Sequence, residues 1–212
     1  MTETALAPTV PTGRPGEQLP TVGNGTLNFG WWGMVLFIAV EATIFALLLA
    51  SYFYVRFRSG PVWPPDGIED PKLKLVLIMS VVLWSSSLPV HLAHSAIKHG
   101  RQRALRACLV IAFLLGATFL ILQCTKEYPD ILRHEYTPRT NAYGSLFFTI
   151  TGLHGAHVFV GLLMNAWTQL RAWQGAFDEH RHVTVQNFVM YWHFVDVVWV
   201  FVLATLYLSP HL

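Results

Sequence analysis

Residues 31–55 read WWGMVLFIAVEATIFALLLASYFYV, an unbroken apolar stretch whose one charged side chain is Glu41. About 20 apolar residues in a helix cross the roughly 30 Å hydrocarbon core of a bilayer. Two tryptophans open the stretch, and three aromatic residues, Tyr52 to Tyr54, close it. Aromatic side chains at both ends are typical of a helix that meets the membrane surface. The stretch therefore predicts a transmembrane helix.

Four further stretches have the same character. They cover residues 74–97, 104–124, 142–173 and 185–208. Each is long enough to span a bilayer, and the fourth is long enough to tilt or to project into water. The sequence thus predicts an all-α, integral membrane bundle of five transmembrane helices, forming one domain over residues 29–212. Residues 1–28 are rich in Pro, Thr and Gly, which predicts a disordered or surface-hugging tail.

Composition agrees with a membrane location and excludes two other classes of protein. Apolar residues make up 53% of the chain and charged residues 12%, whereas soluble domains carry about 25% charged residues. A water-soluble globule is therefore excluded. The net charge of +2 and the lack of a basic block interleaved with aromatics indicate that nucleic acid is not a partner.

The distribution of basic residues predicts the orientation. With five spans, Lys and Arg are evenly divided between the two sides of the membrane. The short loop 98–106 nevertheless holds Lys98, Arg101, Arg103 and Arg106 without an acid, and short loops dominate the positive-inside bias. We therefore expect a multi-pass protein with a cytoplasmic N-terminus and a C-terminus outside.

Glu41 is the most unusual residue of the first span because it lies between apolar neighbours. A carboxylate at membrane depth costs at least about 2.5 kcal/mol. Protonation or a polar partner on another helix relieves that cost. One interpretation is a buried glutamate that is hydrogen-bonded to a neighbouring helix, and the other is a proton-linked or lipid-linked role. We expect Glu41 to be protonated or paired within a helix interface.

Two i,i+3 pairs of polar residues lie in the last two spans. The fourth span carries His154 and His157, and the fifth carries His193 and Asp196. Such spacing places each pair on one helix face and is used by dinuclear metal sites in bundles. No adjacent His-His pair of the kind found in membrane desaturases is present. A buried network, in which Glu41 or Asp196 pairs with a histidine, is the alternative we favour.

We further expect the fourth and fifth spans to cross through these polar faces. His154 or His157 should then lie near His193 or Asp196, at similar depth. Small residues beside the histidines would let two helix backbones approach closely. They form two four-residue steps, Thr151 with Gly155 and Gly152 with Ala156.

Several motifs occur in order and with matching spacing across residues 30–209, and together they resemble subunit III of the haem–copper oxidases. They are Gly33 to Ile38 followed by Glu41, the loop residues Trp63, Pro64 and Pro65 within 62–68, His94-Ser95, Leu122-Gln123 with Glu127-Tyr128, 143–161 around His154 and His157, and 191–199 around His193 and Asp196. Glu41 and the Trp-Pro-Pro loop are most similar to the cytochrome c oxidase branch. Subunit III of quinol oxidases and the accessory protein of nitric oxide reductase are the alternatives within the family.

The resemblance implies an accessory, non-redox subunit of the bacterial inner (plasma) membrane in aerobic respiration. It implies no catalytic residue, cofactor or metal in this chain, with haem and copper in partner subunits. The expected partners are oxidase subunit I by direct packing, other oxidase subunits and membrane lipids, and a respiratory supercomplex is compatible with the family. The implied role is to stabilise subunit I and to support proton uptake.

One departure concerns the front of the chain. Longer family members have two helices before this point, where this sequence has the tail 1–28. We therefore expect the five-helix bacterial form and leave bound phospholipid open, because lipid in the longer forms lies in a cleft made by those two helices. The rival from another class is a membrane di-metal or haem-binding oxidoreductase with ligands among His154, His157 and His193.

Overall fold

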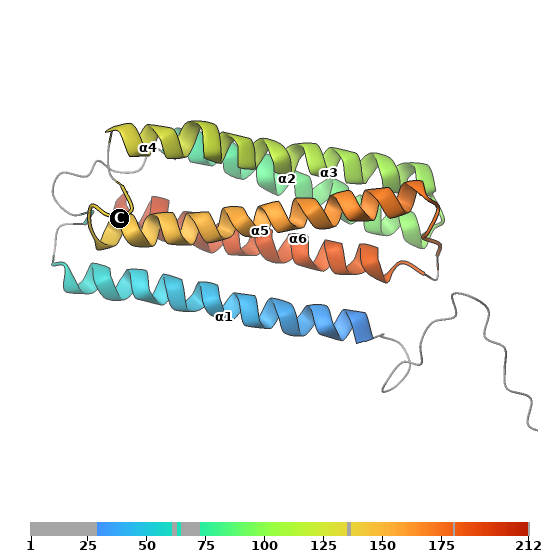
Figure 1. The fold of residues 1–212 in the computed structure, drawn as a ribbon, viewed down its shortest axis with the longest axis horizontal. Coiled ribbons are helices and arrows are strands. Elements are labelled where there is room, and N and C mark those ends of the chain that lie inside the picture. Colours follow the sequence, from blue (N-terminus) through green and yellow to red (C-terminus); the bar gives the residue numbers. More distant parts are fainter. Residues whose placement is uncertain (1–28, 61–62, 65–72, 135–136, 180, 212) are drawn as a thin grey trace, which may run out of the picture.

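The computed structural model describes residues 29–60, 63–64, 73–134, 137–179 and 181–211. The predicted tail 1–28 and loop residue Pro65 lie outside these ranges. Five helices in the described part are long and apolar enough to cross a membrane, which confirms the predicted fold class (Figure 1). These candidate spans are Phe29–Arg58, Leu73–Lys98, Gln102–Leu132, Ala142–Trp173 and Val183–Leu208.

The helices take their bounds from local sequence signals. In chain order they are α1 (Phe29–Arg58), α2 (Leu73–Lys98), α3 (Gln102–Leu122), α4 (Tyr128–His134), α5 (Ala142–Trp173) and α6 (Val183–Val202). Asn141 caps α5 by accepting a hydrogen bond from the backbone N–H of Gly144 at 2.9 Å. Gly100 and Gly175 follow the ends of α2 and α5 with positive φ angles, which glycine adopts without strain.

Two spans continue through a wider, π-helical turn. The turn Gln123–Glu127 joins α3 to α4, and the turn Leu203–Leu208 extends α6 before a short 3₁₀ segment, Ser209–His211. The third span was predicted to end near Cys124, but the helical path continues to Leu132. Because a π-turn holds one extra residue, it rotates the side chains that follow it.

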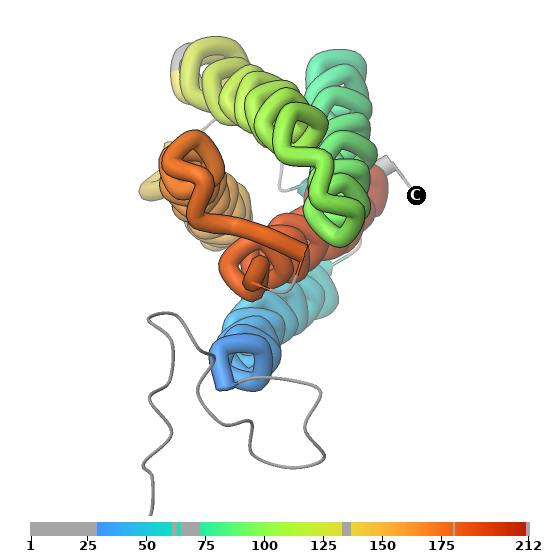
Figure 2. The backbone as a smooth tube through the Cα atoms, turned by 90° about the vertical axis from the view of Figure 1, so that its right-hand side faces the viewer, coloured from blue at the N-terminus to red at the C-terminus, as the bar shows by residue number. Residues whose placement is uncertain are grey.

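Four of the long helices form a closed ring, and the fifth packs on its outside. Within the ring, α2 contacts α3, α3 contacts α5, α5 contacts α6, and α6 returns to α2. The extensive contacts that helix α1 makes with other long helices are those with α5 and α6. Figure 2 shows this arrangement end-on, with α1 below α6 and the other three helices above. Helices α5 and α6 therefore each pack against three other long helices.

Two tryptophans of α6 fill the centre of the ring. Trp192 and Trp199 are both fully buried. The indole of Trp192 lies between Gly116 of α3 and Gly161 of α5, where an added Cβ would come within 2.5 Å and 2.9 Å of the ring. These glycines allow three helices to close around one large side chain.

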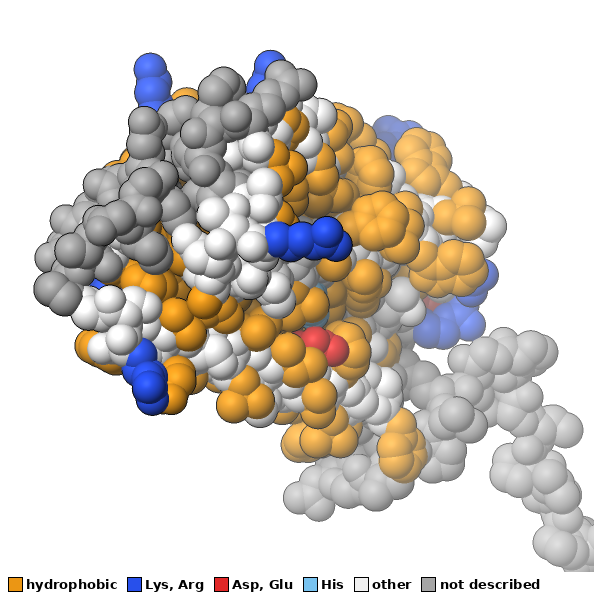
Figure 3. All heavy atoms as spheres, turned by 60° about the vertical axis from the view of Figure 1, so that its left-hand side comes forward, with side chains coloured by type: hydrophobic (Ala, Val, Ile, Leu, Met, Phe, Trp, Pro, Cys, Tyr) orange, Lys and Arg blue, Asp and Glu red, His pale blue; other side chains and the backbone are white. Residues whose placement is uncertain are grey.

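The outer surface of the bundle is largely apolar. Hydrophobic side chains cover much of the face in Figure 3. On α1, Leu36 is 66% exposed and Leu47 is 64% exposed, as expected of side chains that face lipid or another membrane protein. Aromatic residues near the helix ends, such as Trp32 and Trp173, are also exposed, which is typical of the membrane interface.

Candidate functional site

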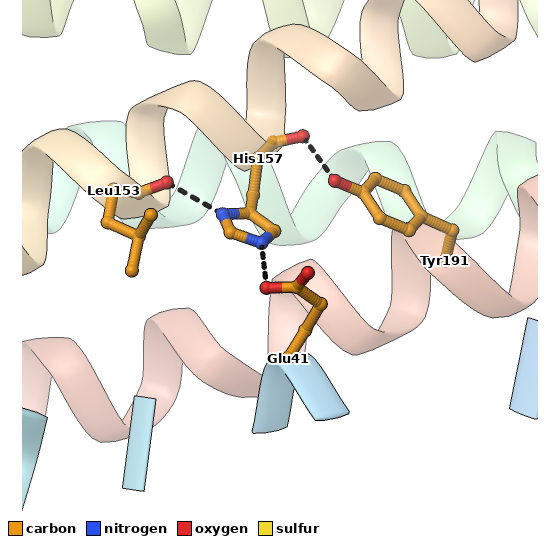
Figure 4. Close-up of polar contacts among 4 residues, drawn as sticks. All are labelled: Glu41, Leu153, His157 and Tyr191. Carbon is orange, nitrogen blue, oxygen red and sulfur yellow. Dashed lines mark hydrogen bonds and ion pairs between the residues drawn. The ribbon is translucent and has the colours of Figure 1, made fainter. Parts of the chain in front are cut away.

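Glu41 of α1 and His157 of α5 form a polar pair at the centre of the α1–α5 contact. Glu41 Oε2 lies 3.1 Å from His157 Nε2, and the two side chains are 19% and 11% exposed. The other ring nitrogen, Nδ1, lies 2.8 Å from the Leu153 carbonyl oxygen. Tyr191 of α6 donates its hydroxyl to the His157 carbonyl at 3.1 Å, so three helices meet here (Figure 4). Glu41 is thus paired within a helix interface.

The geometry places one proton between Glu41 and His157. Because a carbonyl oxygen only accepts hydrogen bonds, His157 Nδ1 must carry the hydrogen that points to Leu153. Nε2 then either accepts a hydrogen from a protonated Glu41 or donates one to the carboxylate. In both cases a single proton is shared by Oε2 and Nε2.

His154, one turn earlier on α5, has a different environment. It is fully buried, and its ring stacks on Trp199 with the centroids 4.8 Å apart. Phe119 meets it edge-on at 5.9 Å. Neither ring nitrogen has a hydrogen-bond partner within the described part of the chain. His154 is therefore an imidazole held among aromatic side chains, and it pairs with neither carboxylate.

Asp196 pairs with a serine of α2, and the expected histidine partner on α5 is not found. Ser87 donates its hydroxyl to Asp196 Oδ2 in a short hydrogen bond. His193 lies on the same side of α6, with Nδ1 3.5 Å from the Ser87 hydroxyl oxygen. Asp196 is 6% exposed, so it faces protein as expected. The predicted approach of His154 or His157 to Asp196 is thus wrong in its choice of partner helix.

Serines of α2 form hydrogen bonds to three residues along one face of α6, which are Trp192, Asp196 and Trp199. Trp192 donates its indole N–H to Ser86 at 2.8 Å, and Trp199 donates to Ser80 at 2.8 Å. Together with the bond between Asp196 and Ser87, these bonds tie the two helices over about two turns. Sequence analysis missed the serines, although polar hydroxyls within an apolar span were the available signal. A central helix with three neighbours offers no local signal for which neighbour its polar face meets.

Glu127 is a second buried carboxyl group, which sequence analysis named only within a family motif and did not select as a candidate site residue. It is 3% exposed and accepts a short hydrogen bond from the hydroxyl of Tyr207, which is 1% exposed. Both residues lie in the two π-helical turns. The prediction ended the third span at Cys124 and so left Glu127 in a loop. The extra residue in the turn instead directs its side chain into the bundle.

The small residues of α5 line its contact with the third span only in part. Thr151 is buried and accepts a hydrogen bond from the Tyr128 hydroxyl at 3.1 Å. A Cβ on Gly155 would come within 2.8 Å of the Gln123 amide oxygen, which is a close approach between helices. The other step is more open, because Gly152 is half-buried and Ala156 is exposed. The close approach thus follows Thr151 and Gly155.

Trp63 joins three parts of the chain at one end of the bundle. Its indole N–H donates to the hydroxyl of Tyr52 on α1 at 2.9 Å. Its ring meets Tyr143 of α5 edge-on, with the centroids 5.3 Å apart. Pro64 is buried and follows a cis peptide bond. The loop motif therefore has a packing role at its described residues.

The order and spacing of these residues match a known family. The family model described as cytochrome c oxidase subunit III matches residues 15–210. The chain belongs to the cytochrome c oxidase subunit III family. The described part of this family member holds no group of three His, Cys, Asp or Glu side chains that could bind a metal ion.

Curated members of the family are similar along most of their length. "Cytochrome c oxidase subunit 3" of Oryctolagus cuniculus is 32% identical over 197 residues, which cover 91% of this chain and 72% of the relative. The protein of the same name from Synechocystis sp. is 35% identical over 195 residues, covering 92% and 81%. That of Pisaster ochraceus is 36% identical over 181 residues, covering 83% and 68%.

Proposed function

We propose that this chain is the accessory subunit III of a haem–copper terminal oxidase of the cytochrome c oxidase type. In this proposal it packs directly against the catalytic subunit I, stabilises it and supports its proton uptake. Haem and copper belong to partner subunits, and this chain supplies no catalytic residue. Membership of the subunit III family and the five apolar helices support this role.

The packing role is carried by a polar cluster on the outside of α2 and α6. We call Ser87, His91, His193 and Asp196 the outer polar cluster. Ser87 and His193 are half-buried, and His91 is exposed although it lies within a membrane-spanning helix. An imidazole in contact with acyl chains is costly, whereas a partner protein can bond to it. The cluster therefore marks the face that meets another oxidase subunit.

Substitution of His91 tests this docking face. His91→Leu should leave the stability of the isolated chain within about 0.5 kcal/mol of the wild type, because the side chain is exposed. The fraction of the chain that stays with the catalytic subunit in mild detergent should nevertheless fall. Asp196→Leu should lower both the retained fraction and the stability of the chain. It also removes the hydrogen-bond partner of Ser87, which should reduce the free energy of unfolding by about 1–3 kcal/mol.

Thr43→Leu on α1 is the matched control, because Thr43 is an exposed polar residue of another membrane-facing surface. Its retention should equal that of the wild type. Loss of the chain with Thr43→Leu and full retention with His91→Leu would place the docking face on α1 instead. Full retention of Asp196→Leu with a dead oxidase would make Asp196 a direct participant in the chemistry.

The Glu41–His157 pair supports the second part of the proposal. Its shared proton lies at membrane depth, and the carboxyl group is partly exposed at the bundle surface. A group that exchanges a proton there can supply protons to a neighbouring subunit without redox chemistry of its own. We accordingly assign Glu41 and His157 a supporting role in proton uptake, with the oxygen chemistry in subunit I.

The accessory assignment also predicts the metal content of the purified chain. The isolated protein should contain no haem and no stoichiometric metal, because the candidate ligands His154, His157 and His193 are engaged in packing or in hydrogen bonds to a carboxyl group and a serine. A pyridine haemochrome spectrum and elemental analysis measure both. One haem or two metal ions per chain would favour the rival membrane oxidoreductase with ligands among His154, His157 and His193.

We also propose a bacterial plasma-membrane location with the N-terminus in the cytoplasm. Four basic residues in and beside the short α2–α3 connection support this orientation: Lys98 ends α2, Arg101 lies in the connection, and Arg103 and Arg106 lie in the first turns of α3. Other oxidase subunits and membrane lipids complete the surroundings of the bundle in this proposal, and a respiratory supercomplex is compatible with it.

A further inference from the structure

A groove opens on the outer surface where the start of α3 meets the end of α5. Its volume is about 580 Å³, within the range of small-ligand sites. We call it the basic groove, and it is lined by Arg103, Arg106, Ala107, Val110, Ile111 and Trp173. The five residues from α3 are spaced as one face of a helix, so the groove follows the helix axis.

Two arginines, Arg103 and Arg106, line the end of the basic groove nearest the start of α3, which we call its mouth. Arg106 is held in place because its Nε–H donates to the Ala172 carbonyl at 3.1 Å and its guanidinium lies 5.1 Å from the centre of the Trp173 ring. One bond through Nε leaves the terminal nitrogens of the guanidinium for a ligand. Arg103, one turn earlier, is exposed beside it. The mouth therefore presents two cations, one of them in a fixed orientation.

Among the residues that the structure describes, no acidic side chain lines the groove. The acids in the described part of the adjoining α5–α6 connection are Asp178 and Glu179. Asp178 forms an ion pair with Arg181 at 3.8 Å, and Glu179 lies against Gly100. The charge at the mouth is therefore available to an anion.

Away from its mouth, the groove is apolar and runs into the membrane-spanning part of α3. Ala107, Val110 and Ile111 are all exposed along it. Their surface matches a hydrocarbon chain and offers nothing to a hydrated ion. Trp173 forms a wall near the end of its helix, at the level where indole rings meet lipid headgroups.

We propose that the basic groove binds one anionic phospholipid. The phosphate lies on Arg103 and Arg106, and one acyl chain follows Ala107, Val110 and Ile111. Guanidinium groups bind phosphate through paired hydrogen bonds, and basic pockets between membrane helices suit anionic headgroups. Phosphatidylcholine fits less well, because its quaternary amine would meet two cations and Trp173 already stacks on Arg106.

The test measures lipid binding to the full chain by native mass spectrometry. Delipidated protein is titrated in detergent with phosphatidylglycerol and, separately, with phosphatidylcholine. The wild type should bind one phosphatidylglycerol molecule more tightly than any further phosphatidylglycerol molecule, and phosphatidylcholine should not displace that first molecule. Arg103→Gln with Arg106→Gln should weaken this binding about 30-fold, which corresponds to about 2 kcal/mol for two basic contacts.

Two further variants separate the headgroup contact from the chain contact. Ala107→Trp fills the apolar part of the groove while keeping both arginines, and it should also abolish the tight binding. Arg56→Gln with Arg58→Gln removes two arginines from the far end of α1, where Arg58 likewise lies over an aromatic ring, Tyr54. That control should bind phosphatidylglycerol as the wild type does.

Three results would overturn the proposal. Equal binding of phosphatidylcholine would show a site without charge selection. Wild-type binding by the Arg103→Gln, Arg106→Gln variant would place the lipid elsewhere. Displacement of the lipid by millimolar inorganic phosphate, together with wild-type behaviour of Ala107→Trp, would show an anion site that makes no use of the acyl chain.

Discussion

Replacing Gly116 by alanine should destabilise the bundle far more than the same change at Gly33. A Cβ at Gly116 would lie 2.5 Å from Trp192 Cη2, whereas one at Gly33 would meet nothing within 4 Å. Both changes bring the same gain in helix propensity, so their difference isolates the overpacking. We expect a difference of about 1–3 kcal/mol in the free energy of unfolding, measured by SDS titration in mixed micelles.

The tryptophan cannot avoid the new methyl group. Its indole N–H is bonded to Ser86 at 2.8 Å, and Gly161 confines the ring from the other side. Trp192→Phe removes the two ring atoms that the methyl group would meet. The double variant Gly116→Ala with Trp192→Phe should therefore lose less stability than the sum of the two single changes. Additive losses would show that the close contact at Gly116 is absent.

His157→Leu should have the second large effect, because it leaves Glu41 without its partner at membrane depth. We expect the free energy of unfolding to fall by about 1–3 kcal/mol, because the carboxyl group loses its hydrogen-bond partner. Replacing both residues, Glu41→Leu with His157→Leu, should recover most of that loss, because apolar pairs often substitute for buried polar pairs at little cost. His154→Leu is the control for loss of packing. It makes the same change at a fully buried histidine that has no hydrogen-bond partner in the described part of the chain, so it leaves no carboxyl group unpaired.

Glu41→Gln separates stability from proton supply at the same pair. The amide can still donate a hydrogen bond to His157 Nε2, so the free energy of unfolding should change little. It cannot exchange a proton, so oxygen reduction by the complex should slow. The loss should stay below the roughly 100-fold cost of removing a group that acts in the chemistry itself. Unchanged turnover would remove Glu41 from proton uptake.

The carboxyl groups show what sequence reasoning could reach. Glu41 lies in the middle of an apolar span, and the cost of that position required a partner. The predictions of a polar partner were correct for both Glu41 and Asp196, since Glu41 pairs with a histidine and Asp196 is buried against another helix. Glu127 was missed because hydropathy placed it beyond the end of a span, while the π-helical turn carries it into the bundle.

The sequence by itself determined the five spans and the polar residues within them. Hydropathy and length are local properties, and a helix that spans a bilayer must be long and apolar, with its backbone hydrogen bonds satisfied internally. The tertiary structure alone decided the partners: Ser87 for Asp196, His157 for Glu41, and two glycines around Trp192. Each partner depends on how a helix is rotated and which neighbours surround it. Rotation is set by close packing across the whole bundle, and no single segment carries that information.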